Sequence, residues 1–148
     1  LRGLVGSEMC IRDRARMDRA ASISAKRHSE EIVVTSSVNH VSFGKPIPIG
    51  TTVTIEAKVS RAFTTSMEVF IDVWIDDDNG KKIKANEAIY TFVAVDSNGR
   101  PTKIDKVIPE SEEEKKRYEA ALRRKQLSLV LAGKMKASDA TELKALFS

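Results

Sequence analysis

The sequence predicts an α+β fold in which an antiparallel sheet packs against one early helix. Residues 15–28 contain no Gly or Pro, as expected for a helix. Four β-rich segments then follow between residues 31 and 96, separated by turn-forming residues. The chain has 148 residues, 41% of them hydrophobic, which suits one domain with its own core.

The predicted first helix has a slim face. Ala21, Ser22 and Ala25 follow Asp18 at helical spacing. Small side chains let the backbone of a sheet come close, so we expect the strands to supply most of the apolar bulk of the core.

The next four segments predict consecutive strands. Residues 31–43 are β-rich and end before Gly44 and Pro46. Residues 51–62 and 66–76 alternate apolar with polar side chains, which indicates one buried and one wet face. The dipeptide Asn79, Gly80 predicts a hairpin turn into a long strand at residues 82–96, and a second turn is expected at residues 97–101.

Two aromatic residues break the polar face of the third strand. Phe70 and Trp74 lie there among acidic residues, which predicts that a further surface covers them, and we therefore expect an oligomer.

The C-terminal part predicts helices outside the sheet. From residue 109 acidic residues come first and basic residues last, which complements a helix dipole. Gly133 is expected to end this helix. Asp139 and Glu142 have the spacing of a capping box for a short final helix.

Composition excludes several function classes. The net charge is only +4 and no aromatic residues interleave with basic ones, so nucleic-acid binding is not expected. The single Cys10 excludes an internal disulfide, while His28 and His40 are expected to be polar surface or helix-end residues, so no metal site is predicted. No apolar run reaches the length of a membrane span and no signal peptide opens the chain, so a soluble cytoplasmic protein is expected.

Residues 1–14 (LRGLVGSEMCIRDR) resemble the translated tail of a sequencing-library adapter, and we interpret them as a non-native segment, with a natural flexible tail as the alternative. The expected organisation is then a sheet-and-helix domain over residues 15–108 and a helical extension over residues 109–148.

An ordered set of motifs resembles the hot-dog-fold acyl-CoA thioesterase family. It spans residues 16–124 and comprises Met17 and Asp18, residues 27–29 (RHS), 33–35 (VVT), Phe43 with Pro46 and Gly50, 65–69 (TSMEV), 90–96 (YTFVAVD) and 112–124 (EEEKKRYEAALRR). The resemblance implies a curved sheet wrapped around the helix, homodimers or trimers of dimers, and active sites between subunits. It also implies hydrolysis of acyl-CoA to a free fatty acid and CoA without a metal or redox cofactor.

The resemblance also implies roles for individual residues. Asp18 matches the catalytic carboxylate, which acts as a general base or as a nucleophile. Thr65 and Ser66 match short hydroxyl residues beside the active site. The residues expected to contact CoA or substrate are Phe43, Lys45, Arg123 and Arg124, the last three through phosphate.

The chain departs from the family pattern at two places. Phe63 or Thr64 stands where a Gly is usual before the hydroxyl pair. Two consecutive glycines of the family, expected to favour oxyanion stabilisation, are replaced by Cys10 and Ile11. Two other functions stay open: a non-catalytic acyl-CoA-binding module and an acyl-thioester hydratase or dehydratase. The latter usually pairs Asp with His at short spacing, whereas His28 lies ten residues after Asp18.

Overall fold

The computed structural model describes residues 2–43, 47, 48 and 50–145, but not the side chains of residues 2–15, 39–43 and 143. In chain order the elements are α1 (Arg2–Ser29), β1 (Ile32–Phe43), β2 (Val53–Ala62), β3 (Ser66–Asp76), β4 (Lys82–Val95), α2 (Glu112–Leu131), the 3-10 turn η1 (Ala137–Asp139) and α3 (Thr141–Lys144). This order confirms the predicted α+β fold.

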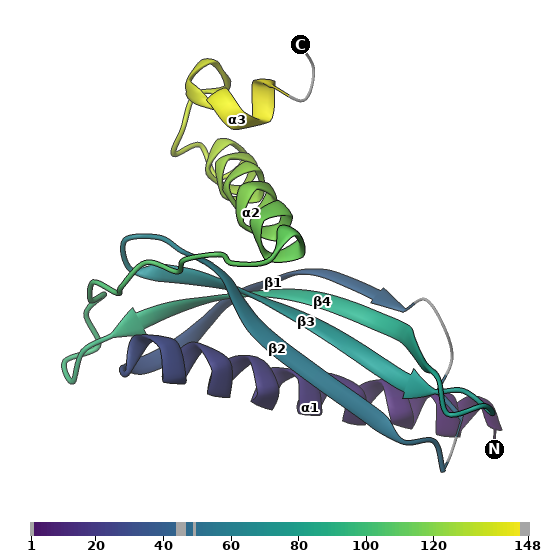
Figure 1. Cartoon of the computed structure of the whole chain (residues 1–148). Coiled ribbons are helices and arrows are strands. Elements are labelled where there is room, and N and C mark those ends of the chain that lie inside the picture. The colour runs from purple at the N-terminus through teal and green to yellow at the C-terminus, as the bar shows by residue number, and fades with distance from the viewer. Residues whose placement is uncertain (1, 44–46, 49, 146–148) are drawn as a thin grey trace.

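The four strands form one antiparallel sheet in the order β1-β4-β3-β2. Figure 1 shows α1 lying along one face of the sheet and α2 rising from the opposite face. We call these the inner and outer faces. β1 and β2 are the two edges of the sheet, and β3 and β4 lie at its centre.

The inner face carries the hydrophobic core. Met17, Ala21 and Ala25 are fully buried, and their spacing of four residues puts them in one stripe along α1. The sheet contributes most of the other buried apolar side chains, namely Met67, Val69, Ile71, Val73, Ala88, Tyr90, Phe92 and Ala94. The predicted slim helix and apolar strands are therefore confirmed.

Helix boundaries differ from the prediction at two places. α1 begins at Arg2 instead of residue 15. The expected capping box of the last helix does not form, because the backbone N–H of Glu142 donates to Oε1 of Gln126, 2.9 Å away, and Asp139 lies in the 3-10 turn. Gly133 follows the C-cap of α2 with a φ of 72°, the left-handed conformation that glycine adopts without strain.

The outer face is covered in part by α2 itself. Phe70 is only 9% exposed, and the guanidinium carbon of Arg117 lies 3.8 Å from its ring centroid. The cover predicted for Phe70 from a partner subunit is thus supplied by the same chain. Trp74 is half-buried.

Candidate active site

Asp18 lies beside the buried stripe of α1. It directly follows Met17, and at about 100° per residue it falls on the opposite flank of the stripe from Ser24. Asp18 is exposed, and its carboxylate makes no hydrogen bond or ion pair within the described residues. The carboxylate is therefore available to water or to a bound molecule.

Thr35 lies on the neighbouring strand β1. It pairs with Phe92, whose side chain is buried on the inner face, so Thr35 points to the same side of the sheet as α1. Thr35 is exposed because β1 is an edge strand. Ser29, which leads the chain toward β1, lies on the same flank of α1 as Asp18. The carboxylate of Asp18 and the hydroxyl of Thr35 thus share the inner side of the sheet toward the β1 edge.

A cavity of about 430 Å³ lies on the other flank of α1. Its walls come from α1, β2, β3, α2 and the segment that leads into α2, and they include Ser24, Arg27, His28, Val59 and Val107. The Nε2 atom of His28 lies 2.7 Å from the carbonyl oxygen of Asp105, which ties the end of α1 to that segment. The volume of this cavity suits a small ligand, but Asp18 is not among the residues that line the cavity.

Thr65 and Ser66 lie at the turn between β2 and β3. The carbonyl oxygen of Thr65 accepts a hydrogen bond of 2.9 Å from the N–H of Ala94. Ser66 is buried, and its Oγ lies 3.2 Å from Nζ of Lys125 on α2. Among the described residues, no hydrogen bond joins Thr65 or Ser66 to Asp18. The structure therefore links the hydroxyl of Ser66 to α2 instead of to the candidate catalytic carboxylate.

The guanidinium of Arg124 is held by a buried carboxylate. Its Nε and Nη2 lie 2.9 Å and 2.6 Å from the two carboxylate oxygens of Glu68. Ser60 also donates to Glu68 with an Oγ–Oε1 distance of 2.6 Å. This pairing compensates the charge of Arg124 and uses two of its five N–H donors, which weakens its candidacy as a phosphate ligand.

The other predicted substrate contacts lie elsewhere. Arg123 is half-buried in a groove of α2 that also contains Phe70 and Lys116. Lys45 lies outside the described residues. Phe43 ends β1 opposite Asn86, and its side chain is likewise outside the description.

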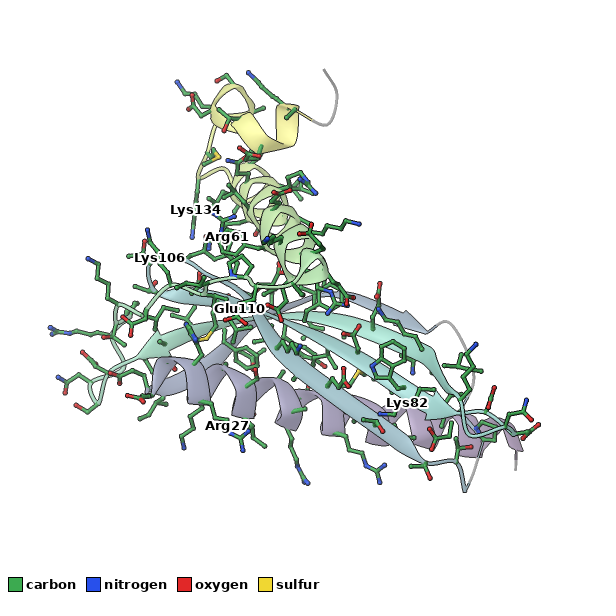
Figure 2. All side chains as sticks on the ribbon, in the orientation of Figure 1. Arg27, Arg61, Lys82, Lys106, Glu110 and Lys134 are labelled. Carbon is green, nitrogen blue, oxygen red and sulfur yellow. The ribbon has the colours of Figure 1, made fainter. Side chains whose placement is uncertain are left out.

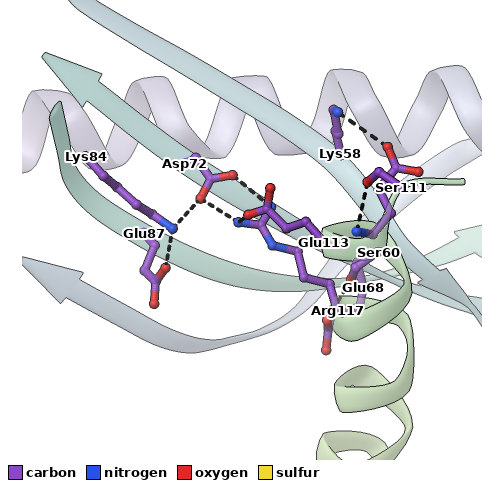
Figure 3. A network of polar contacts seen from close by, with 10 residues as sticks. Lys58, Ser60, Glu68, Asp72, Lys84, Glu87, Ser111, Glu113 and Arg117 are labelled. Atoms are coloured by element: carbon purple, nitrogen blue, oxygen red, sulfur yellow. Dashed lines mark hydrogen bonds and ion pairs between the residues drawn. The ribbon is translucent and has the colours of Figure 1, made fainter. Parts of the chain in front are cut away.

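A second buried carboxylate was not predicted from the sequence. Asp72 receives both terminal nitrogens of Arg117 at 2.8 and 2.9 Å and Nζ of Lys84 at 2.7 Å (Figure 3). Burial alone would raise the pKa of Asp72, but hydrogen bonds and charge from Arg117 and Lys84 outweigh it and hold that pKa below its ordinary value. Lys84, bound also by Glu87 at 2.7 Å, has a raised pKa: burial opposes its charge, but both carboxylates favour it.

Spacing in the sequence carried a signal for these pairs. Glu68 and Asp72 are four residues apart on one strand, so both point to the same face. Arg117 and Arg124 are seven residues apart, about two turns of one helix face. The distance between Glu68 and Asp72 along the strand is similar to the distance between Arg117 and Arg124 along the helix. The ion pairs of Glu68 with Arg124 and of Asp72 with Arg117 can therefore form side by side.

Comparison with known proteins identifies relatives. Residues 15–81 match the model of the thioesterase superfamily. The chain is 41% identical over 109 residues to an uncharacterized acyl-CoA thioester hydrolase, YkhA, of Bacillus subtilis, covering 73% of this chain and 63% of that protein. It is 35% identical over 106 residues to the cytosolic acyl coenzyme A thioester hydrolase of Rattus norvegicus, covering 70% of this chain and 28% of that protein. The chain thus spans less than two thirds of these curated relatives.

Solved structures show the same fold. An apo-hexameric acyl-CoA thioesterase superposes with a TM-score of 0.77 at 34% identity, covering 82% of this chain and 78% of the other. An acyl-CoA hydrolase from Staphylococcus aureus was solved with butyryl coenzyme A, coenzyme A and coenzyme A disulfide. It superposes with a TM-score of 0.74 at 37% identity, covering 89% of this chain and 80% of the other.

Alanine variants of the Staphylococcus aureus enzyme were also solved. Their substituted aspartate and threonine lie 17 positions apart, at 43 and 60, and Asp18 and Thr35 have the same spacing. A substituted asparagine lies 15 positions before that aspartate, where this chain has Gly3. The fold, the family match and the similarity over most of the hexameric neighbour agree: this chain belongs to the thioesterase superfamily and has its hot-dog fold.

Proposed function

We propose that this chain hydrolyses acyl-CoA thioesters to a free fatty acid and CoA, and that Asp18 is the catalytic carboxylate. The main support is Asp18 on the flank of α1 that faces β1, which is exposed and has no ion-pair or hydrogen-bond partner among the described side chains. Its spacing to Thr35 also matches that of the substituted pair of the Staphylococcus aureus enzyme.

In the proposed reaction Asp18 accepts a proton from water as the water oxygen attacks the thioester carbonyl. The tetrahedral intermediate then collapses, the C–S bond breaks and CoA leaves as the thiolate, which takes up a proton. Such general-base assistance contributes roughly 10²–10⁴ in rate. The hydroxyl of Thr35 orients the attacking water or the carboxylate. CoA enters as part of the substrate, and the steps of this reaction require no metal or redox cofactor.

Thiol release from short, medium and long acyl-CoA substrates tests this function. We expect Asp18→Ala to lose at least about 10²-fold in kcat with CoA binding and melting temperature nearly unchanged. Asp78→Asn, which removes another exposed carboxylate at the β3–β4 turn, should leave the rate unchanged. More than about a tenth of the activity left in Asp18→Ala would remove Asp18 from this role.

The nucleophilic route is distinguished by isotope labelling. If Asp18 attacks the thioester, an anhydride forms, and water opens it in a second step. A single turnover in ¹⁸O water would then label the carboxylate of Asp18 whenever water attacks the aspartyl carbonyl. The general-base route puts the label only in the released fatty acid. Mass spectrometry of the peptide that contains Asp18 separates the two.

Residues 1–14 call for a matched comparison. Side chains at Cys10 and Ile11 replace the two glycines expected from the resemblance, and crowding there would weaken oxyanion stabilisation. We expect the chain to hydrolyse acyl-CoA poorly and to gain activity and stability when residues 1–14 are replaced by the N-terminus of a relative. Equal rates and equal melting temperatures for the two versions would contradict this interpretation.

We also propose that the active protein is a cytoplasmic homo-oligomer, a homodimer or a trimer of dimers. The edge strand β1 exposes Ile32, Val34 and Val38 by about half, and an unpaired edge with apolar side chains invites strand pairing. The similar solved thioesterase is hexameric and the rat relative is named as cytosolic. No helix in the described ranges has the length and apolar character of a membrane span. A concentration-independent monomer mass in light scattering would contradict the oligomer.

A further inference from the structure

Cations gather around the turn that joins β2 to β3. The guanidinium carbon of Arg61 and Nζ of Lys125 lie 5.8 Å and 5.2 Å from the ring centroid of Phe63. Nζ of Lys125 also lies 3.2 Å from Oγ of Ser66. Figure 2 shows Arg61 and Lys134 on the same side of α2. We call Arg61, Lys125 and Lys134 the turn cluster.

Among the described residues, the turn cluster has no carboxylate partner of the kind that neutralises other cations of the outer face. Arg124, the residue before Lys125, is bound by buried Glu68. By contrast, Lys125 and Lys134 have no carboxylate partner within the described residues. Within the described part of the chain, Arg61 contacts the rings of Phe63 and Tyr118 and the carbonyl oxygen of Tyr118, 3.0 Å from Nη1. A region of uncompensated positive charge therefore lies over the Phe63 ring.

Lys125 is held in an environment that disfavours its own charge. It is half-buried, and this burial, followed by repulsion from the charge of Lys134, lowers its pKa below the ordinary lysine value. A bound anion would relieve both effects. Partial burial also strengthens the attraction between Lys125 and such an anion compared with a fully hydrated surface pair.

We propose that the turn cluster is a phosphate-binding site and that, given the proposed function, the phosphate is carried by coenzyme A. Lys125 and Lys134 supply ammonium donors, and Arg61 supplies planar guanidinium donors, a combination suited to a phosphate group. The hydroxyl of Ser66 fixes the ammonium of Lys125 at the turn. Ser66 is then a positioning residue for the coenzyme instead of a partner of Asp18.

Binding measurements test the site without requiring turnover. By calorimetry, CoA and 3′,5′-ADP should bind about tenfold more weakly to Lys125→Gln and to Lys134→Gln, a change of about 1.4 kcal/mol. Lys125→Arg should retain binding. The control Lys116→Gln removes the same charge from an exposed site of α2 and should have no effect. Melting temperatures show whether each variant folds, and Lys134 is exposed, so at least that variant should remain folded.

Kinetics with two substrates identify the source of the phosphate. For Lys125→Gln, KM for butyryl-CoA should rise about tenfold with kcat within about twofold, while both constants for butyryl-pantetheine, which lacks the phosphates, stay unchanged. A rise in KM for both substrates, or equal binding of 3′,5′-ADP by Lys125→Gln and Lys116→Gln, would overturn the site. If the unchanged chain releases no thiol yet binds 3′,5′-ADP through Lys125, the phosphate site stands and the hydrolase proposal fails.

Discussion

The two faces of the sheet are both covered by a helix, yet they are held by different interactions. On the inner face, α1 presents Met17, Ala21 and Ala25 to apolar side chains of the sheet, and these three residues are fully buried. On the outer face, α2 reaches buried carboxylates of β3 through Arg117 and Arg124. Apolar side-chain packing thus holds α1 against the sheet, whereas buried ion pairs hold α2.

This difference determines which amino-acid substitutions each face of the sheet tolerates. Apolar packing is lost gradually as volume is removed, whereas a buried ion pair that loses one partner leaves an uncompensated charge. Replacing both partners of such a pair together is often nearly neutral. Substitutions on the two faces should therefore follow different rules.

The largest effect is expected on the inner face. Phe92 is 1% exposed and stacks near Tyr90 with ring centroids 6.2 Å apart. Phe92→Ala should lower the free energy of unfolding by about 3–5 kcal/mol, because it removes a large buried side chain and leaves a cavity. Urea denaturation measures this, with Leu127→Ala at a partly exposed site of α2 as the control, for which we expect a much smaller loss.

Arg124→Met should cost about 2–3 kcal/mol, less than the full value for a buried pair, since Arg124 keeps 29% of its side chain exposed. The double variant Glu68→Met with Arg124→Met should recover most of this loss because no buried charge is left alone. If the two single variants simply add in a double-mutant cycle, the pair is not coupled, and the proposed contrast between the faces is wrong.

Acid should weaken the outer face through Asp72. Its folded pKa is lowered, so its contribution is present above the ordinary carboxyl pKa of about 4 and is lost as the pH falls through the folded pKa. The free energy of unfolding measured from pH 7 down to pH 2 should fall more steeply for the parent than for Asp72→Asn. Parallel curves would show that Asp72 does not contribute in this way.

The smallest effect is expected at the start of α2. Oγ of Ser111 accepts the backbone N–H of Glu114 at 3.1 Å and so caps the helix. Ser111→Ala should cost about 1 kcal/mol, whereas Ser111→Asp, which restores an acceptor, should cost little. Thermal unfolding with hydrogen exchange at residues 112–115 would detect the fraying. Unchanged exchange there would show that the ion pairs alone fix the first turn.

Much of the fold follows from the sequence because its main signals are local. Alternation in residues 66–76 predicted β3 with its observed bounds, and the Asn79, Gly80 turn predicted its hairpin with β4. The start of α1 at Arg2 was not predicted, since residues 1–14 have no clear hydrophobic period. The cover over Phe70 was attributed to a partner because α2 is distant in sequence, and long-range contacts leave no local pattern.

The candidate site was harder to predict for the same reason. Asp18 was chosen by resemblance, and Thr35 became a candidate only through the spacing in a solved relative. Arg124 illustrates the difficulty: its charge is a local fact, but its binding to Glu68, 56 residues away, depends on how α2 docks. Charge alone could not tell a phosphate ligand from a structural ion pair.

The way α2 is attached has a calorimetric consequence. The heat-capacity change of unfolding rises with exposed apolar surface and falls with exposed polar surface. Release of α2 uncovers carboxylates and guanidinium groups together with Phe70, so the two contributions oppose each other. The heat-capacity change of unfolding of this chain should then arise mainly from the inner face. A molecule whose α2 has detached would keep most of this heat-capacity change while losing its outer cover.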